Sequence, residues 1–332
     1  MIEAIAFPQS SGLQPLSTTC RFVNSADIVT IRGVRLMIQR HQRTLARPAA
    51  FRGFGFLSGA DVSVNFLPAD EHSGIHFQRV DLRGSDPVPA TLDCVVPRER
   101  RTAISKNGVT IELIEHVMAA LAGLQIDNCL VQLNAPELPG ADGSCLPFVQ
   151  SLLDAGIVEQ SAKRDVLVIC ANAETPTCSD GSEIFVGPVF RRTLVVTYEL
   201  DYGPRSPIRP QLMTFEFSPE SFVANIAFAR TFILETEVTA LRAQGHGARV
   251  TEKDLLIFGA KGVVGNELRS PDECVRHKIL DCIGDFALLG CDVHGHFRAF
   301  RSGHNLNHVI CQQIQRKNQR SQSKPINECR AA

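Results

Sequence analysis

The stretch from Val275 to Gly290 constrains the fold most, because it has the period of one amphipathic helix closed by a glycine. His277, Asp281 and Asp285 stand four residues apart and share one polar stripe, while apolar neighbours such as Ile279 can face a core. A histidine and an aspartate one turn apart can offer a nitrogen and an oxygen to the same metal ion. Taken alone, however, the stripe also fits a solvated helix face.

A second histidine lies in the segment 110–124, where a strand end runs into an apolar, alanine-rich helix that Gly123 can terminate. Glu115 and His116 are the polar residues of this helix, and an unpaired buried glutamate costs too much to be accidental. His116 could be a zinc ligand, with Glu115 as the base that takes a proton from water. The alternative is a core histidine bonded to a backbone carbonyl, with Glu115 at an exposed rim.

The order of elements predicts an α+β fold that repeats one plan. Short alternating runs indicate antiparallel strands in each half, and each set of strands is followed by helices. Aligning the two helices on His116 and His277 favours two similar sheet-plus-helices domains, packed helix layer to helix layer as a β-α-α-β sandwich with the active site between them. The predicted parts are a leader of uncertain order (1–36), a first domain (37–162), a second domain (163–315) and a polar tail (316–332).

Two further polar segments could carry chemistry. The loop Arg301–Asn307 follows a strand and contains a glycine beside His304, so it could present a mobile imidazole as a general acid or simply a surface histidine. In the segment Ala229–Phe232, Thr231 could donate a hydrogen bond to a developing oxyanion, or the segment could be an ordinary helix end.

Composition excludes several classes of protein. A net charge of -1 over 332 residues, with no block of like charge, gives no basic field for nucleic acid. No apolar run approaches the length of a membrane helix, although transient contact with a membrane surface stays open. The eleven cysteines are odd in number and form no Cys-x-x-Cys pair, which favours reduced thiols in the cytoplasm.

Several segments together resemble the UDP-3-O-acyl-N-acetylglucosamine deacetylases, zinc enzymes of lipid A biosynthesis. The matching segments occur in the family's order and with compatible spacing between about Gln39 and Gln315. They are Ile114–His116, Ala119–Asn128, Asn134–Pro139, Asp142–Ser144, Ala229–Phe232, Val275–Asp281, Ile283–Asp285 and Ser302–Asn307.

The resemblance implies zinc-dependent hydrolysis of the N-acetyl group of UDP-3-O-(3-hydroxyacyl)-N-acetylglucosamine, releasing acetate in the committed step of lipid A biosynthesis. It implies that zinc, or Fe²⁺ in the cell, is bound by His116, His277 and Asp281. It also implies that Glu115 is the base, that His304 is an acid kept protonated by Asp285, and that Thr231 helps to bind the oxyanion. Lys278 and Phe232 would contact the UDP-linked, acylated glucosamine. An insert at about 234–265 would build an apolar passage for the acyl chain, with Leu255–Phe258 as candidate lining.

The chain departs from the family at three places. The family's Pro-Ile-Met-Asp-Gly-Ser appears as Pro139-Gly140-Ala141-Asp142-Gly143-Ser144, an expected paired glycine followed by serine appears as Gly245-His246-Gly247-Ala248, and an early His-Thr-Gly turn appears as Leu57-Ser58-Gly59 after Phe56. Two rival hypotheses therefore stay open at this point: a zinc amidase for another N-acyl amino sugar, and a non-catalytic, metal-stabilised binding protein.

Overall fold

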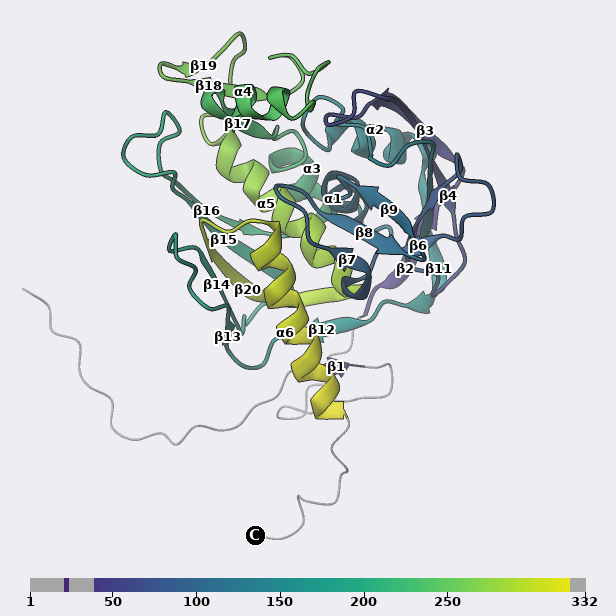
Figure 1. Cartoon of the computed structure of the whole chain (residues 1–332). Coiled ribbons are helices and arrows are strands. Elements are labelled where there is room, and N and C mark those ends of the chain that lie inside the picture. The colour runs from purple at the N-terminus through teal and green to yellow at the C-terminus, as the bar shows by residue number, and fades with distance from the viewer. Residues whose placement is uncertain (1–20, 24–38, 323–332) are drawn as a thin grey trace, which may run out of the picture.

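Two helices pack against each other between two β-sheets. The computed structural model describes residues 21–23 and 39–322, and it places α1 (Glu115–Gly123) and α5 (Glu273–Phe286) side by side, with one large sheet on either side of the pair (Figure 1). The predicted α+β fold class, with sheets outside and helices inside, is confirmed. The exact division into domains at residues 162 and 163 stays a prediction.

The first sheet has the strand order β3-β4-β10-β5-β6, and only its β10–β5 pair is parallel. Its strands are β3 (Ala49–Phe54), β4 (Asp61–Pro68), β5 (Ile75–Arg79), β6 (Val88–Pro89) and β10 (Cys129–Leu133). Along β4 the inward side chains Val62, Val64 and Phe66 are buried and alternate with more exposed ones, as a strand with one covered face requires.

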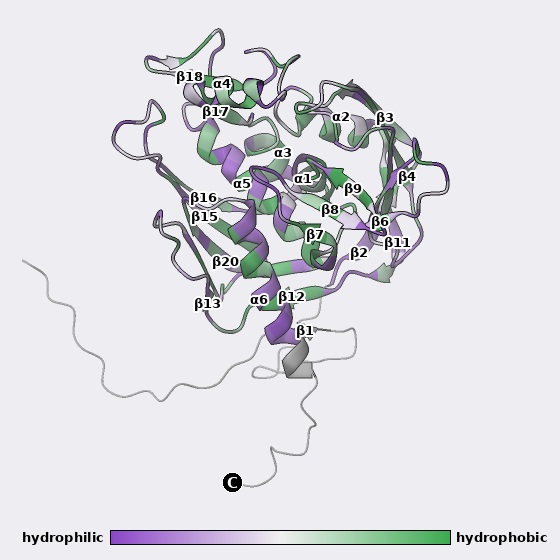
Figure 2. Cartoon of the chain, viewed as in Figure 1, coloured by the Kyte–Doolittle hydropathy of each residue, from purple (hydrophilic) through white to green (hydrophobic). Residues whose placement is uncertain are grey.

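The second sheet is built around β20 (Asp292–Phe300), which pairs with β12, β14 and β15. The other strands are β1 (Arg21–Val23), β12 (Val166–Val168), β13 (Ala173–Glu174), β14 (Glu183–Gly187), β15 (Leu194–Leu200) and β16 (Gln211–Glu216). Alternate residues of β20, such as Val293 and Phe297, are buried against the helices. Figure 2 shows apolar residues, in green, along the strands of both sheets.

Smaller elements complete the fold. A ribbon joins β2 (His41–Leu45) to β11 (Ile157–Lys163), and a three-stranded sheet contains β7 (Val95–Val96), β8 (Ala103–Lys106) and β9 (Val109–Glu112). A third small sheet, β17 (Phe232–Leu234), β18 (Leu256–Gly259) and β19 (Gly262–Val263), lies with α4 (Glu235–Ala243) at the top of Figure 1. The remaining helices are α2 (Leu146–Ala155), α3 (Pro219–Asn225), α6 (His304–Gln322) and the 3-10 helices η1 (Leu92–Cys94) and η2 (Ala287–Leu289).

Some predicted boundaries differ from the observed ones. The predicted division between residues 162 and 163 falls inside β11, which is held by antiparallel pairing with β2. Within the predicted leader, Arg21–Val23 form β1 against β12, and within the predicted tail, α6 runs on to Gln322. The other parts of these two predictions, residues 1–20, 24–36 and 323–332, lie outside the described residues.

A close helix crossing joins the two halves of the core. A Cβ atom added at Gly284 of α5 would lie 2.2 Å from the carbonyl oxygen of Glu115 and 3.2 Å from the backbone nitrogen of Ala119, both in α1. Only glycine allows the two backbones to approach so closely. The apolar side chains around this crossing form one continuous cluster that reaches both sheets. Among residues 21–23 and 39–322, no helix is both long and apolar enough to cross a membrane.

Candidate active site

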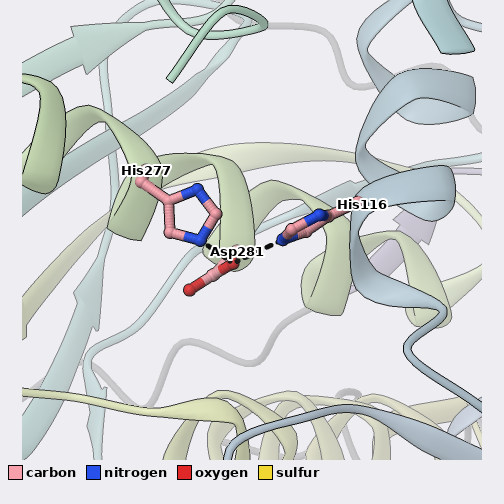
Figure 3. Close-up of side chains that lie close together, drawn as sticks. All are labelled: His116, His277 and Asp281. Atoms are coloured by element: carbon pink, nitrogen blue, oxygen red, sulfur yellow. Dashed lines mark ion pairs between the residues drawn. The ribbon is translucent and has the colours of Figure 1, made fainter. Parts of the chain in front are cut away.

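His116, His277 and Asp281 converge where α1 and α5 cross (Figure 3). The Nε2 atoms of His277 and His116 lie 3.3 and 3.8 Å from Oδ1 of Asp281, and the three donor atoms fit within 4.8 Å of one another. This oxygen of Asp281 is buried and has no hydrogen-bond partner among the described residues. An unpaired buried carboxylate oxygen is costly, and two imidazole nitrogens beside it make a donor set that suits a divalent metal.

Local structure fixes both histidines. Leu113 adopts a left-handed backbone conformation, with φ of 60°, and so turns the chain from β9 into α1 just before Glu115 and His116. His277 donates from Nδ1 to the carbonyl oxygen of Ala229 over 3.1 Å, which leaves Nε2 free to face Asp281.

The carbonyl of Ala229 is itself held by a buried ion pair. The guanidinium of Arg230 donates from Nε to Glu273 over 2.7 Å, and the backbone N–H of Arg230 donates to the same carboxylate over 3.1 Å. Both side chains are buried. This pair was not predicted from the sequence. It connects the segment before β17 to the first residue of α5, and so it holds the carbonyl group that accepts the hydrogen bond from His277.

The charge states suit metal binding. Burial and the neighbouring His277 lower the pKa of His116 to about 3, and burial also lowers the pKa of His277. Burial disfavours the charged form of Asp281, but His277 and Lys278 outweigh it and hold the pKa of this carboxyl below its usual range. Two neutral imidazoles and one carboxylate are the forms that coordinate a metal ion.

Glu115 stands beside this cluster and is itself buried, with 3% of its surface exposed. Its Oε2 accepts a hydrogen bond of 3.0 Å from the backbone N–H of Thr102, and its Oε1 lies 4.0 Å from Nε2 of His304. Burial raises the pKa of Glu115 to about 7, although nearby His304 opposes this. A carboxyl group with this pKa can both accept and release a proton near neutral pH.

His304 was predicted to lie in a mobile loop, but the structure places it at the start of a helix. It is the first residue of α6 and is 9% exposed, and its Nδ1 donates to Oδ2 of Asp285 over 2.8 Å. The prediction was wrong because the glycine before it was taken as the middle of a turn, whereas a helix begins immediately after that glycine. Burial disfavours the imidazolium, but Asp285 outweighs burial and raises the pKa of His304 to about 9.

Three further predicted site residues, Thr231, Phe232 and Lys278, line a cavity beside the metal cluster. Thr231 lies directly before β17, and its backbone N–H donates to the carbonyl of Gly143 over 2.7 Å. The ring of Phe232 packs edge-on against His277, with centroids 6.1 Å apart. Lys278 donates from Nζ to Oδ2 of Asp281 over 2.8 Å, so its ammonium group is directed at the outer oxygen of the carboxylate.

One cavity of about 1320 Å³ is lined by Glu115, His116, Thr231, Phe232, His277, Lys278, Asp281 and His304. Its walls include residues of the predicted insert, among them Leu255 and Ile257, whereas Leu256 and Phe258 pack into the hydrophobic core. The alternation of side chains along β18 explains why two of the four predicted lining residues face the cavity and two do not, and a passage for an acyl chain stays a prediction. The cavity exceeds the roughly 300–1,000 Å³ that is typical of small-molecule sites, so it can hold a large ligand.

Sequence reasoning also missed a second layer of polar residues around His304. Thr102, Asn307 and His308 are buried and contact Asp285. The spacing of His304 and His308, one helical turn apart, was a usable signal once a helix start at His304 is assumed. Thr102 gave no signal, since it lies in a polar segment with no periodicity.

The chain is similar to known proteins over most of its length. Residues 42–316 match the family model described as "UDP-3-O-acyl N-acetylglycosamine deacetylase". A protein of Geotalea uraniireducens named UDP-3-O-acyl-N-acetylglucosamine deacetylase is 39% identical over 275 residues, which cover 82% of this chain and 88% of that protein. Proteins with the same name from Neisseria gonorrhoeae and Myxococcus xanthus are 37% and 35% identical, again over 82% of this chain and over 89% and 86% of their own lengths.

Proposed function

The chain belongs to the UDP-3-O-acyl N-acetylglycosamine deacetylase family, and on that premise we propose how its residues hydrolyse the N-acetyl group of a UDP-linked, 3-O-acylated glucosamine in lipid A biosynthesis. The observation that carries the proposal is the convergence of three metal-binding side chains, one carboxyl group and one imidazole on a single cavity. These five groups come from α1, α5 and α6, so the site exists only when both halves of the fold meet.

We assign the metal to His116, His277 and Asp281. The unpartnered Oδ1 of Asp281 and the two imidazole nitrogens directed at it support this assignment, and two nitrogens with one oxygen suit zinc, with Fe²⁺ as the alternative. When bound there, the ion would supply Lewis acidity that activates water and polarises the acetyl carbonyl.

Glu115 acts as the general base in this proposal. Its Oε2 is anchored by the N–H of Thr102, so Oε1 is the atom directed toward His304 and the site. As the water oxygen bonds to the acetyl carbon, Oε1 takes a proton from the water. A base with a pKa of about 7 is ionised in a large fraction of molecules at neutral pH, as this step requires.

His304 acts as the general acid. Because Nδ1 donates to Asp285, the proton available for transfer is the one on Nε2, which faces Glu115 across 4.0 Å. With a pKa of about 9, the imidazole is protonated at neutral pH. When the carbon–nitrogen bond breaks, Nε2 gives its proton to the sugar nitrogen, and the second proton of the attacking water leaves the new carboxyl group for solvent, so the products are acetate and an amine. Asp285 then keeps the neutral ring in one tautomer.

Thr231, Phe232 and Lys278 complete the site as we propose it. Thr231 lines the cavity and can donate its hydroxyl to the oxyanion, and Phe232 lines the same cavity and can contact the sugar. Lys278 is placed to attract the negatively charged substrate while its Nζ holds Asp281. We assign the reaction to the cytoplasm, with transient contact to the membrane surface when an acylated substrate is collected.

A metal analysis combined with a deacetylation assay tests this function. We expect the purified chain to contain about one zinc ion, to lose acetate release on chelation and to recover it on return of zinc. Glu115→Gln and His304→Gln should each lower kcat by about 10²- to 10⁴-fold. Glu216→Gln serves as a control, because its exposed carboxylate pairs with Arg191 and neither residue lines the cavity.

The substrate is tested by comparing acylated with non-acylated UDP-N-acetylglucosamine. We expect faster acetate release from the acylated compound, since the insert contributes apolar walls to the cavity. Equal kcat/KM for the two compounds would contradict the lipid A assignment, and full activity in metal-free protein would contradict the metal mechanism.

A further inference from the structure

Thr102 contacts the general base Glu115 and also Asp285, the carboxylate that holds the general acid His304. It is the residue directly before β8 and is 1% exposed. Its backbone N–H donates to Oε2 of Glu115 over 3.0 Å, and its carbonyl oxygen accepts from the N–H of Ile114 over 3.2 Å. These two bonds attach the start of β8 to the first turn of α1, so the backbone of Thr102 fixes the carboxyl group of Glu115.

The hydroxyl of Thr102 points to the other half of the site. Its Oγ1 lies 2.5 Å from Oδ1 of Asp285 and 3.1 Å from Nε2 of His308. Burial disfavours the charged form of Asp285, but His304 and His308 outweigh it and hold its pKa well below the usual range. Because the carboxylate is therefore ionised, the threonine must donate its single proton to Asp285, and His308 must donate to Oγ1.

Asp285 is consequently held at both oxygens. Oδ1 accepts from Thr102, and Oδ2 accepts from Nδ1 of His304 over 2.8 Å and from Nδ2 of Asn307 over 2.7 Å. A carboxylate bonded in this way cannot rotate without breaking a buried hydrogen bond. Because Nδ1 of His304 donates to this carboxylate, the position of the carboxylate constrains the orientation of the ring, and the hydroxyl of Thr102 thereby helps to set the direction of the Nε2 proton.

We infer that Thr102 is a positioning residue that aligns the general base Glu115 and the general acid His304 with each other, through its N–H and through its hydroxyl on Asp285. The inference rests on the roles proposed above for those two residues. Thr102 thereby connects the start of β8 in the first half to α5 and α6 in the second. A substitution that removes its hydroxyl should affect His304 and leave the metal ligands in place.

The test separates the hydroxyl of Thr102 from its backbone. Thr102→Val keeps the shape and the N–H to Glu115 but removes the donor to Asp285, and Thr102→Ser returns that donor. Thr110→Val is the matched control, because Thr110 lies on β9 of the same small sheet and its hydroxyl donates to Ser105. For each variant, kcat and KM for acetate release from the acylated UDP-sugar, zinc content and melting temperature are measured.

We expect Thr102→Val to lower kcat by about 10- to 100-fold, because one hydrogen bond to a charged group is lost. KM should change by less than about 3-fold and zinc content should not change, since orientation of the proton-transfer groups matters chiefly in the transition state. Thr102→Ser should recover most of kcat, and Thr110→Val should resemble the parent enzyme.

Several outcomes would overturn the inference: an unchanged kcat in Thr102→Val, equal losses in the valine and serine variants, or a loss that follows zinc content. If Thr102→Val does not fold, Thr102→Ala, which leaves space beside Asp285, decides the question, and full kcat in that variant refutes the inference. Turnover that survives both Glu115→Gln and His304→Gln would refute the proposed catalytic roles instead, so the two failures are distinguishable.

Discussion

Gly284→Ala tests whether the crossing of α1 and α5 assembles the site. In an ordinary helix interior, replacing glycine by alanine stabilises a protein by about 1 kcal/mol. Here the new Cβ would lie 2.2 Å from the carbonyl oxygen of Glu115. The obstacle is backbone, which no side-chain rotation can remove, so the helices must separate by roughly 1 Å, and overpacking of this kind costs about 1–3 kcal/mol. We therefore expect Gly284→Ala to lower the free energy of unfolding, whereas glycine to alanine in an ordinary helix raises it.

The same movement should damage the metal cluster. His116 follows Glu115 in α1, whereas His277 and Asp281 belong to α5, so separation of the helices lengthens the distances between these donors. A misplacement of about 1 Å in catalytic groups can reduce kcat by about 100-fold. We expect Gly284→Ala to show a lower free energy of unfolding, weaker zinc binding and a lower kcat together.

Denaturant unfolding, competition with a zinc chelator and acetate release measure the three effects. Gly303→Ala is the stability control, because a Cβ there meets no atom within 4 Å, and its free energy of unfolding should stay within about 0.5 kcal/mol of the parent. A Gly284→Ala protein that is more stable than the parent and binds zinc equally well would refute the close-crossing argument.

Three further predictions follow from named contacts. A Cβ at Gly140 would lie 2.1 Å from the ring of Phe56, so Gly140→Ala should lower the melting temperature, and Phe56→Ala should relieve that clash; strictly additive losses in the double variant would contradict the contact. Activity should fall as pH rises through about 9, where His304 loses its proton, and also as pH falls through about 7, where Glu115 gains one; Asp285→Asn should move the alkaline limb of the kcat profile to lower pH, because the carboxylate is what raises the pKa of His304, and an unmoved limb would be the contrary result. Removal of zinc by a chelator should lower the melting temperature, because a metal that binds only the folded state stabilises it. If calorimetry of the metal-free protein gives the same transition with and without added zinc, no metal binds to the folded state.

Local periodicity was enough to predict part of the site. His277 and Asp281 are one helical turn apart, so their proximity follows from the amphipathic pattern alone, and the structure places them 3.3 Å apart. His116 required a comparison between two helices, and the layered α+β arrangement brought it to the same place. The one helix predicted for Val275–Gly290 is α5, which ends at Phe286, followed by the 3-10 helix η2, and Gly290 adopts the left-handed conformation that ends η2.

The supporting residues could not be predicted in the same way. Thr102 is 183 residues from Asp285 in the sequence and 206 from His308, and a single threonine has no pattern that indicates such contacts. Gly284 was a readable signal that was overlooked, because an isolated glycine inside an apolar helix often marks close packing. Long-range polar networks depend on which elements the tertiary fold brings together, and that information is not carried by local propensity.

The three departures from the family pattern, scattered in the sequence, meet on one wall of the cavity. The ring of Phe56 fills the space that a side chain at Gly140 would need, and the carbonyl of Leu57 accepts a hydrogen bond of 3.4 Å from the N–H of Gly247. All four residues line the same cavity as the metal cluster. Because Phe56 could not occupy its position if residue 140 had a side chain, the changes at these two sites depend on each other. We therefore expect these residues to shape one wall of the cavity together, and we predict that substitutions there change substrate preference more than they change metal binding.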